Sequence, residues 1–246
     1  MTNTVPGHEL GYQTKLEEVY VEGVEPLLIR SLLDRQQYYD PDGLAEALGI
    51  SSAIWPLFGL VWPSGLQLAA QIATRPVRET ERILEIGCGL AIASLVAHRR
   101  GAQITASDCH PFAPRFLNDN LHLNGLSGLP YRHGQWGEAK PVSALLNVCL
   151  LSDRYDLLIG SDVLYERDTP QQLAEFIDRH AAEQAEVWIV DPDRGHRPAF
   201  NRKMASRGFV LKQEAKMPAF VKVGPATKEP YKGRMMIYRR QNALTR

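Results

Sequence analysis

The chain has 246 residues, of which 44% are hydrophobic and 23% are charged, as is usual for one large globular domain. Basic and acidic residues both number 28, so no bulk charge points to a nucleic acid or a membrane as a partner. The three cysteines have no metal-ligand spacing, and the N-terminus shows no signal peptide. No apolar run approaches the roughly 18 residues of a membrane span. We therefore expect a cytoplasmic protein without a membrane-spanning segment.

Residues 1–50 are predicted to form an N-terminal extension to a main domain that spans residues 51–246. Within the extension, a partial alternation of apolar residues favours two strands over 15–21 and 26–30, joined as a hairpin. A short helix is expected over 44–48, after a turn sequence and before a glycine. This small unit is expected to lie outside the main sheet.

Two Trp-Pro pairs, which begin at Trp55 and Trp62, stand unusually close together for a loop. Ser64 is expected to cap a helix that runs to about Thr74. A tryptophan directly before such a helix can lie over an aromatic or cationic ligand. In the alternative, both tryptophans seal the edge of the sheet, and the residues by themselves favour this alternative.

The most informative pattern is a strand, a glycine turn, a helix and a second strand. The first strand ends in Gly87 and Gly89, and the helix covers 91–100. The second strand, 102–107, ends in Asp108. This is the order and length of a βαβ unit. In such a unit the glycines let a ligand approach the backbone, and the helix N-terminus offers free N–H groups.

Three features of this unit favour S-adenosylmethionine over a dinucleotide as the ligand. The dinucleotide fingerprint needs a third glycine, and Ile92 stands in its place. Glu85, two residues before the turn, would repel a phosphate but suits a cationic amine. Asp108, at the tip of the second strand, can take both hydroxyls of a ribose. S-adenosylmethionine has a ribose, an ammonium and a sulfonium but no phosphate, so it fits better than NAD.

Later strands deliver further side chains to the same edge of the predicted sheet. A strand over 131–135 precedes Trp136, which can stack on adenine or pack in the core. The next buried strand carries Ser161, Asp162 and Tyr165 to its carboxyl end, where open α/β sheets bind ligands. We predict that this polar cluster is functional.

The last elements complete the predicted fold. An amphipathic helix is expected over 169–183, followed by a strand over 187–190. The strands 209–211 and 235–238 are joined by a basic loop without a helix, so they should pair antiparallel. The predicted fold is α/β, a Rossmann-like methyltransferase three-layer sandwich. Its seven-stranded sheet is mostly parallel with an antiparallel last strand, and the small N-terminal extension is added to it.

The whole set of motifs resembles the seven-β-strand S-adenosylmethionine methyltransferases, and within them the family 16 group of protein N-methyltransferases. Four motifs carry the resemblance in the family's order: W-P-x-G at 62–65, E-x-G-x-G at 85–89 with Asp108, W-G at 136–137 and D-x-x-Y at 162–165. The turn 191–194, Asp-Pro-x-Arg, is similar to one in some mitochondrial and bacterial members, including those that act on electron-transfer flavoprotein. The first fifty residues support no such carry-over.

The resemblance, together with the strand ends, assigns roles to the site residues. Seven residues are predicted to bind the cofactor S-adenosylmethionine: Trp62, Glu85, Gly87, Gly89, Asp108, Trp136 and Ser161. Asp162 and Tyr165 are predicted to be catalytic, and no metal is expected. Asp162 would accept a hydrogen bond from the acceptor amine and aim its lone pair at the methyl group, while Tyr165 closes the pocket.

The predicted activity is therefore an S-adenosylmethionine-dependent N-methyltransferase, with a protein lysine side chain as the preferred acceptor. Two alternatives stay open: an N-methyltransferase of a small amine or heteroaromatic metabolite, and a catalytically silent S-adenosylmethionine-binding module. An NAD-dependent oxidoreductase would lack its third glycine. Nucleic-acid methylation would lack the Asn-Pro-Pro-Tyr type of motif.

The expected partner is a protein substrate, or else a small-molecule acceptor, with no nucleic acid and no membrane involved. A local group of basic residues would suit an acidic surface on a protein partner, or would be a solvated face. Its members are Arg194, His196, Arg197, Arg202 and Lys203. The identity of the acceptor, the methylation state and the oligomeric state do not follow from the sequence.

Overall fold

The computed structural model describes residues 3–5, 11–137, 149–165 and 169–240. Its centre is a seven-stranded sheet with the order β6-β5-β4-β7-β8-β12-β9. Neighbours from β6 to β8 are parallel, whereas β12 is antiparallel to both β8 and β9. The strands are β4 (Arg82–Ile86), β5 (Gln103–Asp108), β6 (Tyr131–His133), β7 (Tyr155–Ser161), β8 (Ala181–Asp191), β9 (Phe209–Lys216) and β12 (Arg234–Arg240). The predicted α/β class, with its antiparallel last strand, is confirmed.

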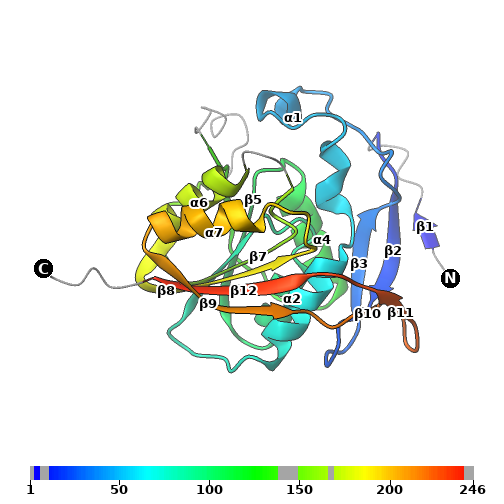
Figure 1. Cartoon of the computed structure of the whole chain (residues 1–246). Helices are drawn as coiled ribbons and strands as arrows, with labels where there is room; N and C mark the ends of the chain where they lie inside the picture. The colour runs from blue at the N-terminus through cyan, green and yellow to red at the C-terminus, as the bar shows by residue number, and fades with distance from the viewer. Residues whose placement is uncertain (1–2, 6–10, 138–148, 166–168, 241–246) are drawn as a thin grey trace, which may run out of the picture.

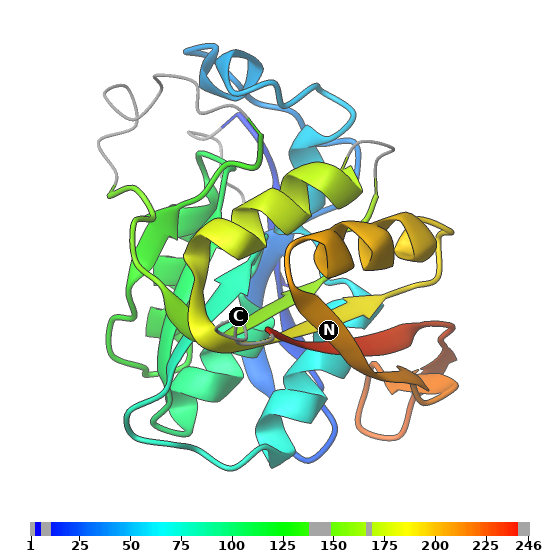
Figure 2. The ribbon, with the colours of Figure 1, turned by 60° about the vertical axis from the view of Figure 1, so that its left-hand side comes forward.

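Helices cover both faces of the sheet and complete the three-layer sandwich (Figures 1 and 2). The helices are α2 (Pro63–Thr74), α3 (Ile92–Arg99) and α4 (Ala113–Leu123) in one layer, and α6 (Thr169–His180) and α7 (Arg197–Ser206) in the other. Each central strand contributes side chains to both hydrophobic cores, because successive side chains along a strand point to opposite faces of the sheet. In β4, Ile83 belongs to the core on the α3 side, whereas Leu84 and Ile86 belong to the core on the α6 side.

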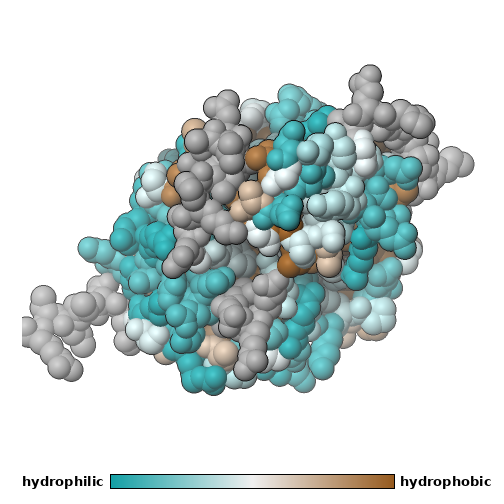
Figure 3. Space-filling model, turned by 90° about the horizontal axis from the view of Figure 1, so that it is seen from above, coloured by the Kyte–Doolittle hydropathy of each residue, from teal (hydrophilic) through white to brown (hydrophobic). Residues whose placement is uncertain are grey.

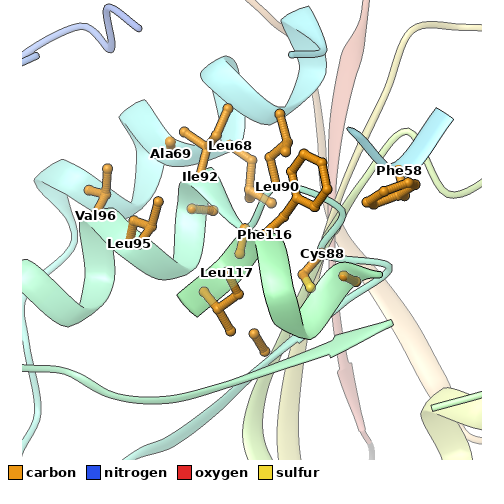
Figure 4. Close-up of a cluster of buried hydrophobic side chains, with 14 of the residues drawn as sticks. Phe58, Leu68, Ala69, Cys88, Leu90, Ile92, Leu95, Val96, Phe116 and Leu117 are labelled. Atoms are coloured by element: carbon orange, nitrogen blue, oxygen red, sulfur yellow. The ribbon is translucent and has the colours of Figure 1, made fainter. Parts of the chain in front are cut away.

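Figure 4 shows the core on the α3 side. Leu68 of α2, Leu95 of α3 and Phe116 of α4 point into the space that these helices enclose, and all three are fully buried. The apolar residues recur at helical spacing, which is why these segments form helices with one buried face.

The predicted cap of α2 is wrong. Trp62 is the N-cap residue, and no side chain caps this end, where Pro63 takes the first helical position. Proline suits that position because it lacks the N–H group that would be unsatisfied there. The buried hydroxyl of Ser64 instead lies 2.9 Å from the hydroxyl of Tyr231.

The predicted end of the helix over 169–183 is also wrong. Helix α6 ends at His180, because Ala181 already pairs with Tyr155 and begins β8. The basic loop before the last strand holds a further small hairpin, formed by β10 (Phe220–Lys222) and β11 (Lys228–Pro230).

The N-terminal region contains the predicted hairpin and adds a third strand. The elements are β1 (Asn3–Val5), β2 (Thr14–Val19), β3 (Leu27–Leu32), α1 (Leu44–Ala47) and the 3-10 helix η1 (Trp55–Gly59). The three strands form an antiparallel sheet separate from the main one, beside α4 (Figure 1).

Two asparagines of α4 attach this small sheet to the main body. Asn120 accepts a hydrogen bond from the backbone N–H of Arg30 at 2.7 Å and donates one to its carbonyl at 3.3 Å. Asn124 makes the same pair of bonds to Leu28, at 3.0 and 2.8 Å.

The apolar side of the N-terminal region belongs to the core on the α3 side. Tyr12, Leu27, Ile29 and Trp55 are buried in that core. The region therefore shares a hydrophobic core with the rest of the molecule, and the domain boundary at residue 50 stays a prediction. In the part of the chain that the structure describes, every helix is too short or too polar to span a bilayer.

Candidate active site

A cavity of about 290 Å³ lies at the carboxyl ends of β4, β5 and β7. The strand order reverses at β4, which has β5 on one side and β7 on the other. Open α/β sheets bind their ligands at such a point. All of the predicted site residues line this cavity: Trp62, Glu85, Gly87, Gly89, Asp108, Trp136, Ser161, Asp162 and Tyr165.

Figure 3 views the molecule from the side that carries α1, whose following residues line the cavity. Hydrophobic surface gathers near the middle of this side, with hydrophilic side chains around it. Such a mixture, mostly apolar with a few convergent polar groups, is typical of small-ligand sites.

The glycine turn after β4 forms one wall. Gly87 and Gly89 have φ angles of 59° and 51°, in the left-handed region that favours glycine. A Cβ atom on Gly89 would lie 2.7 Å from the carbonyl oxygen of Phe58. Glycine at this position therefore allows the segment that contains Phe58 to lie directly against the turn.

Glu85 connects the glycine turn to helix α3. Its Oε2 atom accepts hydrogen bonds from the Ser94 N–H, 2.8 Å away, and from the Ser94 hydroxyl. Ser94 lies in the first turn of α3, so the carboxylate satisfies a free N–H group of the helix end. Burial raises the pKa of Glu85 to about 7, although the hydrogen bonds from Ser94 oppose this shift. A cationic ligand in the cavity would favour the charged form.

Asp108 is held by backbone donors. Its Oδ2 atom accepts a hydrogen bond from the Gly89 N–H, and Oδ1 accepts one from the His110 N–H, both at 2.9 Å. Burial raises the pKa of Asp108, and these backbone hydrogen bonds oppose the shift. Each carboxylate oxygen can accept more than one hydrogen bond, so both can still receive the hydroxyls of a ribose.

The charges of the cavity fit S-adenosylmethionine better than a dinucleotide. Among the described lining residues, His110 and Arg194 are the basic ones. Burial lowers the pKa of His110 to about 3, so this imidazole is neutral. Arg194 lies at the far end, beside Asp162. A pyrophosphate would meet two carboxylates at the glycine turn, whereas an ammonium and a ribose would find acceptors there.

The tryptophans of the site differ in role. Trp55 is fully buried among aromatic rings. Trp62 is half-buried and lines the cavity, and its indole N–H donates to the Leu57 carbonyl at 2.8 Å. The ring of Trp136 lies over Gly87, where an added Cβ would come within 3.4 Å of it. Trp62 and Trp136 can therefore both contact a ligand, and stacking of Trp136 on adenine stays a prediction.

The other end of the cavity is formed by Ser161, the last residue of β7, and by the residues that follow it. Asp162 has a φ of 60°, which is uncommon for a residue with a side chain, and its N–H donates to the Val190 carbonyl at 3.0 Å. Its side chain is 12% exposed and forms an ion pair with Arg194. Tyr165 is 41% exposed, and its ring centre lies 6.4 Å from that of Trp136. Unusual backbone conformations of this kind cluster at functional sites.

Sequence reasoning missed the segment that covers the cavity. Besides Trp62, seven residues between α1 and α2 line it: Leu48, Gly49, Ile50, Ile54, Leu57, Phe58 and Leu60. The Gln135 side chain donates a hydrogen bond to the Leu48 carbonyl at 3.1 Å and ties this segment to the loop after β6. No periodicity marks these residues, and the two Trp-Pro pairs are the only hint in the sequence that they are structured.

His110, which follows β5, also lines the cavity and was not predicted from the sequence. Its ring stacks on Phe58 with the centroids 3.6 Å apart. Nδ1 accepts a hydrogen bond from the Phe112 N–H at 3.2 Å, which leaves Nε2 as the protonated nitrogen. Among the described residues, this buried Nε2 has no hydrogen-bond partner.

The fold and this cavity together define the class of S-adenosylmethionine-dependent methyltransferases with a Rossmann-like sheet. Residues 52–204 match the model of a family described as lysine methyltransferase. Because this match covers more than half of the chain, the chain belongs to that family. Membership implies S-adenosylmethionine as the cofactor, in agreement with the carboxylates at the glycine turn.

Several characterised proteins are similar to this chain. It is 27% identical to the human electron transfer flavoprotein beta subunit lysine methyltransferase, over 56% of this chain and 50% of that protein. It is 31% identical to the histone-arginine methyltransferase METTL23 of Xenopus laevis, over 43% of this chain and 44% of that protein. The protein N-lysine methyltransferase METTL21A of Xenopus tropicalis is 26% identical, over 55% and 62% of the two chains. The chain thus spans about half the length of the first relatives it matches.

Solved structures share the fold at low sequence identity. A methyltransferase from Pyrococcus furiosus matches with a TM-score of 0.52 and 18% identity, over 82% of this chain and 87% of that one. TrmN from Thermus thermophilus matches with a TM-score of 0.52 and 11% identity, over 72% and 48% of the two chains.

Proposed function

We propose that this chain transfers a methyl group from S-adenosylmethionine to a nitrogen atom, with a lysine side chain of a protein as the acceptor. The observation that carries the proposal is one cavity with carboxylates at both ends: Glu85 and Asp108 at the glycine turn, and Asp162 at the other end. Family membership and the named activities of the relatives support lysine as the acceptor.

The residues at the glycine turn would hold the cofactor. Glu85 would bind its ammonium, Asp108 its ribose hydroxyls, and Trp62 and Trp136 would pack against it. When bound, S-adenosylmethionine supplies a methyl group on a sulfonium. Holding an acceptor in line with that group lowers the barrier, since positioning alone supplies much of the catalysis in such two-reactant steps.

Asp162 and Tyr165 would act on the acceptor. A lysine amine has an ordinary pKa of about 10.4, and its ammonium must first give a proton to solvent at the exposed mouth of the cavity. Removal from water and a neighbouring positive charge both lower that pKa. Asp162 would then accept a hydrogen bond from the amine and orient its lone pair. The free lone pair then forms the N–C bond as the S–C bond of the sulfonium breaks. Tyr165 would pack against the acceptor at the mouth.

The exposure of the acceptor end supports a protein substrate. Tyr165 is 41% exposed, and the side chain of Arg194 is 38% exposed, so both can be reached from solvent. A lysine that projects from a protein surface could enter beside them. Methylation of a small amine is the alternative that the experiment must separate.

The test is transfer of labelled methyl from S-adenosylmethionine into an extract of cells that lack this protein. After the reaction, the extract is divided into macromolecules and small molecules, and labelled proteins are hydrolysed to identify the methylated residue. We expect label in a protein band as methyllysine, and loss of that label with Asp162→Asn. Label in the small-molecule fraction alone would replace the protein substrate by a metabolite.

A binding measurement completes this test. Calorimetry with S-adenosylhomocysteine, the demethylated product, should show that wild-type protein and Asp162→Asn bind it alike. Binding without transfer to any acceptor would favour a catalytically silent module.

A further inference from the structure

Arg194 lies at the acceptor end of the cavity and contacts the carboxylate assigned to the acceptor amine. Its guanidinium pairs with Oδ1 of Asp162, and both residues line the cavity. The carboxylate that the proposed function assigns to the acceptor amine is thus paired with a cation from the chain itself.

Neighbouring arginines are paired differently. Arg197 contacts Asp193 at 2.6 Å and Glu214 at 3.3 Å, and Arg234 lies 3.2 Å from the same Glu214. These acids lie outside the lining of the cavity. Among the ion pairs of the described residues, Arg194 differs because its recorded partner is a residue of the cavity. Within the predicted basic group, Arg197 is therefore paired outside the cavity, whereas Arg194 lies in the site.

The turn that carries Arg194 is fixed without the help of its guanidinium. The Asp193 N–H donates to Asp191 at 2.8 Å, and the Asp193 carboxylate accepts the hydrogen bond from Arg197. Asp193 and Gly195 have φ angles of 65° and 92°, so a tight turn is built on both sides of Arg194. The guanidinium can therefore leave Asp162 while the turn keeps its conformation.

A second carboxylate makes this end of the cavity attractive to cations. Asp191 is fully buried at the end of β8, and its Oδ1 has no hydrogen-bond partner within the described residues. Burial is the main reason that the pKa of Asp191 is raised; Asp162 raises it further and Arg194 lowers it. The carboxylates of Asp162 and Asp191 thus share the positive charge of the Arg194 guanidinium. Departure of Arg194 would leave an excess of negative charge at this end of the cavity.

We propose that Arg194 is a placeholder that occupies Asp162 in the free protein and is displaced by the cationic amine of the acceptor. This inference rests on the proposed role of Asp162. It makes Arg194 a specificity residue, because an ammonium can replace a guanidinium on a carboxylate, whereas a neutral or anionic acceptor cannot. The acceptor class is therefore an aliphatic ammonium, as on lysine, rather than a neutral heteroaromatic ring.

The competition can be measured without methyl transfer. Protein saturated with S-adenosylhomocysteine is titrated with n-butylammonium, which mimics the lysine side chain, and binding is followed by NMR. Arg194→Gln should bind the probe about fivefold more tightly than wild type, the upper end of the effect expected when a partly exposed competing ion pair is removed. Arg202→Gln is the matched control: this exposed arginine of α7 has no recorded ion pair among the described residues, and its removal should leave binding unchanged.

Two further variants identify the site of the effect. Asp162→Asn combined with Arg194→Gln should lose the tighter binding, because the carboxylate that both cations use is gone. In Arg194→Gln, methylguanidinium should compete with n-butylammonium, because it mimics the missing head group. Thermal unfolding of each variant shows that the fold is retained.

The inference is wrong if Arg194→Gln binds n-butylammonium no more tightly than wild type, or if neither protein binds it. It is also wrong if Arg202→Gln has the same effect, since general charge would then explain the result. The proposed function fails separately, if no lysine of any protein becomes methylated while the probe still binds. If lysine is methylated but Arg194→Gln binds the probe as wild type does, the placeholder role of Arg194 alone is overturned.

Discussion

The carboxylates at the two ends of the cavity are held in different ways. Glu85 accepts a hydrogen bond from a backbone N–H of α3, and Asp108 accepts them from the N–H groups of Gly89 and His110; both carboxylates are buried. Asp162 instead pairs with the long side chain of Arg194, which is 38% exposed. Backbone donors cannot move without a change in the fold, whereas an exposed side chain can exchange its partner.

This difference matches what each end has to do under the proposed function. A cofactor of constant structure is best bound by groups that are fixed in advance, because less ordering remains to be done on binding. An acceptor brought in by another protein needs a contact that can be opened. Under the proposed function, a substitution at one end should therefore leave the other end unchanged.

The largest effect is expected from Asp162→Asn. The neutral amide cannot accept the hydrogen bond of the amine and orient its lone pair as the carboxylate does. The rate of methyl transfer should therefore fall by about 100-fold or more. The affinity for S-adenosylhomocysteine, measured by calorimetry, should change little, because Asp162 lies at the proposed acceptor end. Equal losses of rate and cofactor affinity would show that the two ends are not separate.

Gly89→Ala should damage the cofactor end. Its Cβ would lie 2.7 Å from the Phe58 carbonyl, and its φ of 51° is unfavourable for alanine by about 1–2 kcal/mol. We expect the cofactor dissociation constant to rise by at least about tenfold, the equivalent of roughly 1.4 kcal/mol. Gly101→Ala is the control, since its φ is 83° but no atom lies within 4 Å of the added Cβ. It should lower stability alone, with unchanged binding.

The affinity for the cofactor should depend on pH through Glu85. Its pKa is about 7 in the free protein, so the carboxylate gains a proton as the pH falls below 7 and then attracts an ammonium less. The dissociation constant for S-adenosylhomocysteine should therefore rise by up to about tenfold per pH unit below pH 7 and level off above it. Asp108 and Cys88 are the titratable groups coupled to Glu85. Glu85→Gln should remove this pH dependence of the dissociation constant. An unchanged pH dependence in that variant would assign the titration to Asp108.

The smallest effect is expected behind the acceptor end, at Tyr231. Burial raises the pKa of this phenol to about 12, so the hydroxyl stays protonated and paired with the buried Ser64. Tyr231→Phe should lower the free energy of unfolding by about 1 kcal/mol, measured by urea denaturation, and leave cofactor binding unchanged. With Ser64→Ala added, the loss should be less than the sum of the two single losses, because one hydrogen bond is shared.

The main sheet and its cavity were predictable from local patterns. Strands such as 155–161 are short apolar runs that end in polar residues, and parallel strands bring their carboxyl ends to one edge. Glu85, Gly89 and Asp108 are therefore neighbours in any fold that contains their βαβ unit. The family resemblance added the assignments of Trp62 and Trp136, and their contacts with a ligand remain predictions.

Features that depend on distant contacts were not predictable. Ser64 is a good cap residue by type, but Pro63 before it and Tyr231 far along the chain decide its contacts. The cover formed by residues 48–60 has no regular period, so the sequence does not show that it lines the cavity. The pairing of Arg194 with Asp162 joins two separate loops, and local spacing carries no information about it.

The two asparagines of α4 also have a consequence for the solubility of the protein. Strand β3 is the last strand of the small sheet, and an open strand edge is a template for pairing with another chain. Four residues along a helix advance by about 6.0 Å, and two residues along a strand by about 6.6 Å. The spacing of Asn120 and Asn124 along the helix therefore matches that of Arg30 and Leu28 along the strand. Their side-chain amides make the hydrogen bonds that the backbone of a neighbouring strand would make. The helix in this way covers an edge that is otherwise open to pairing with another strand.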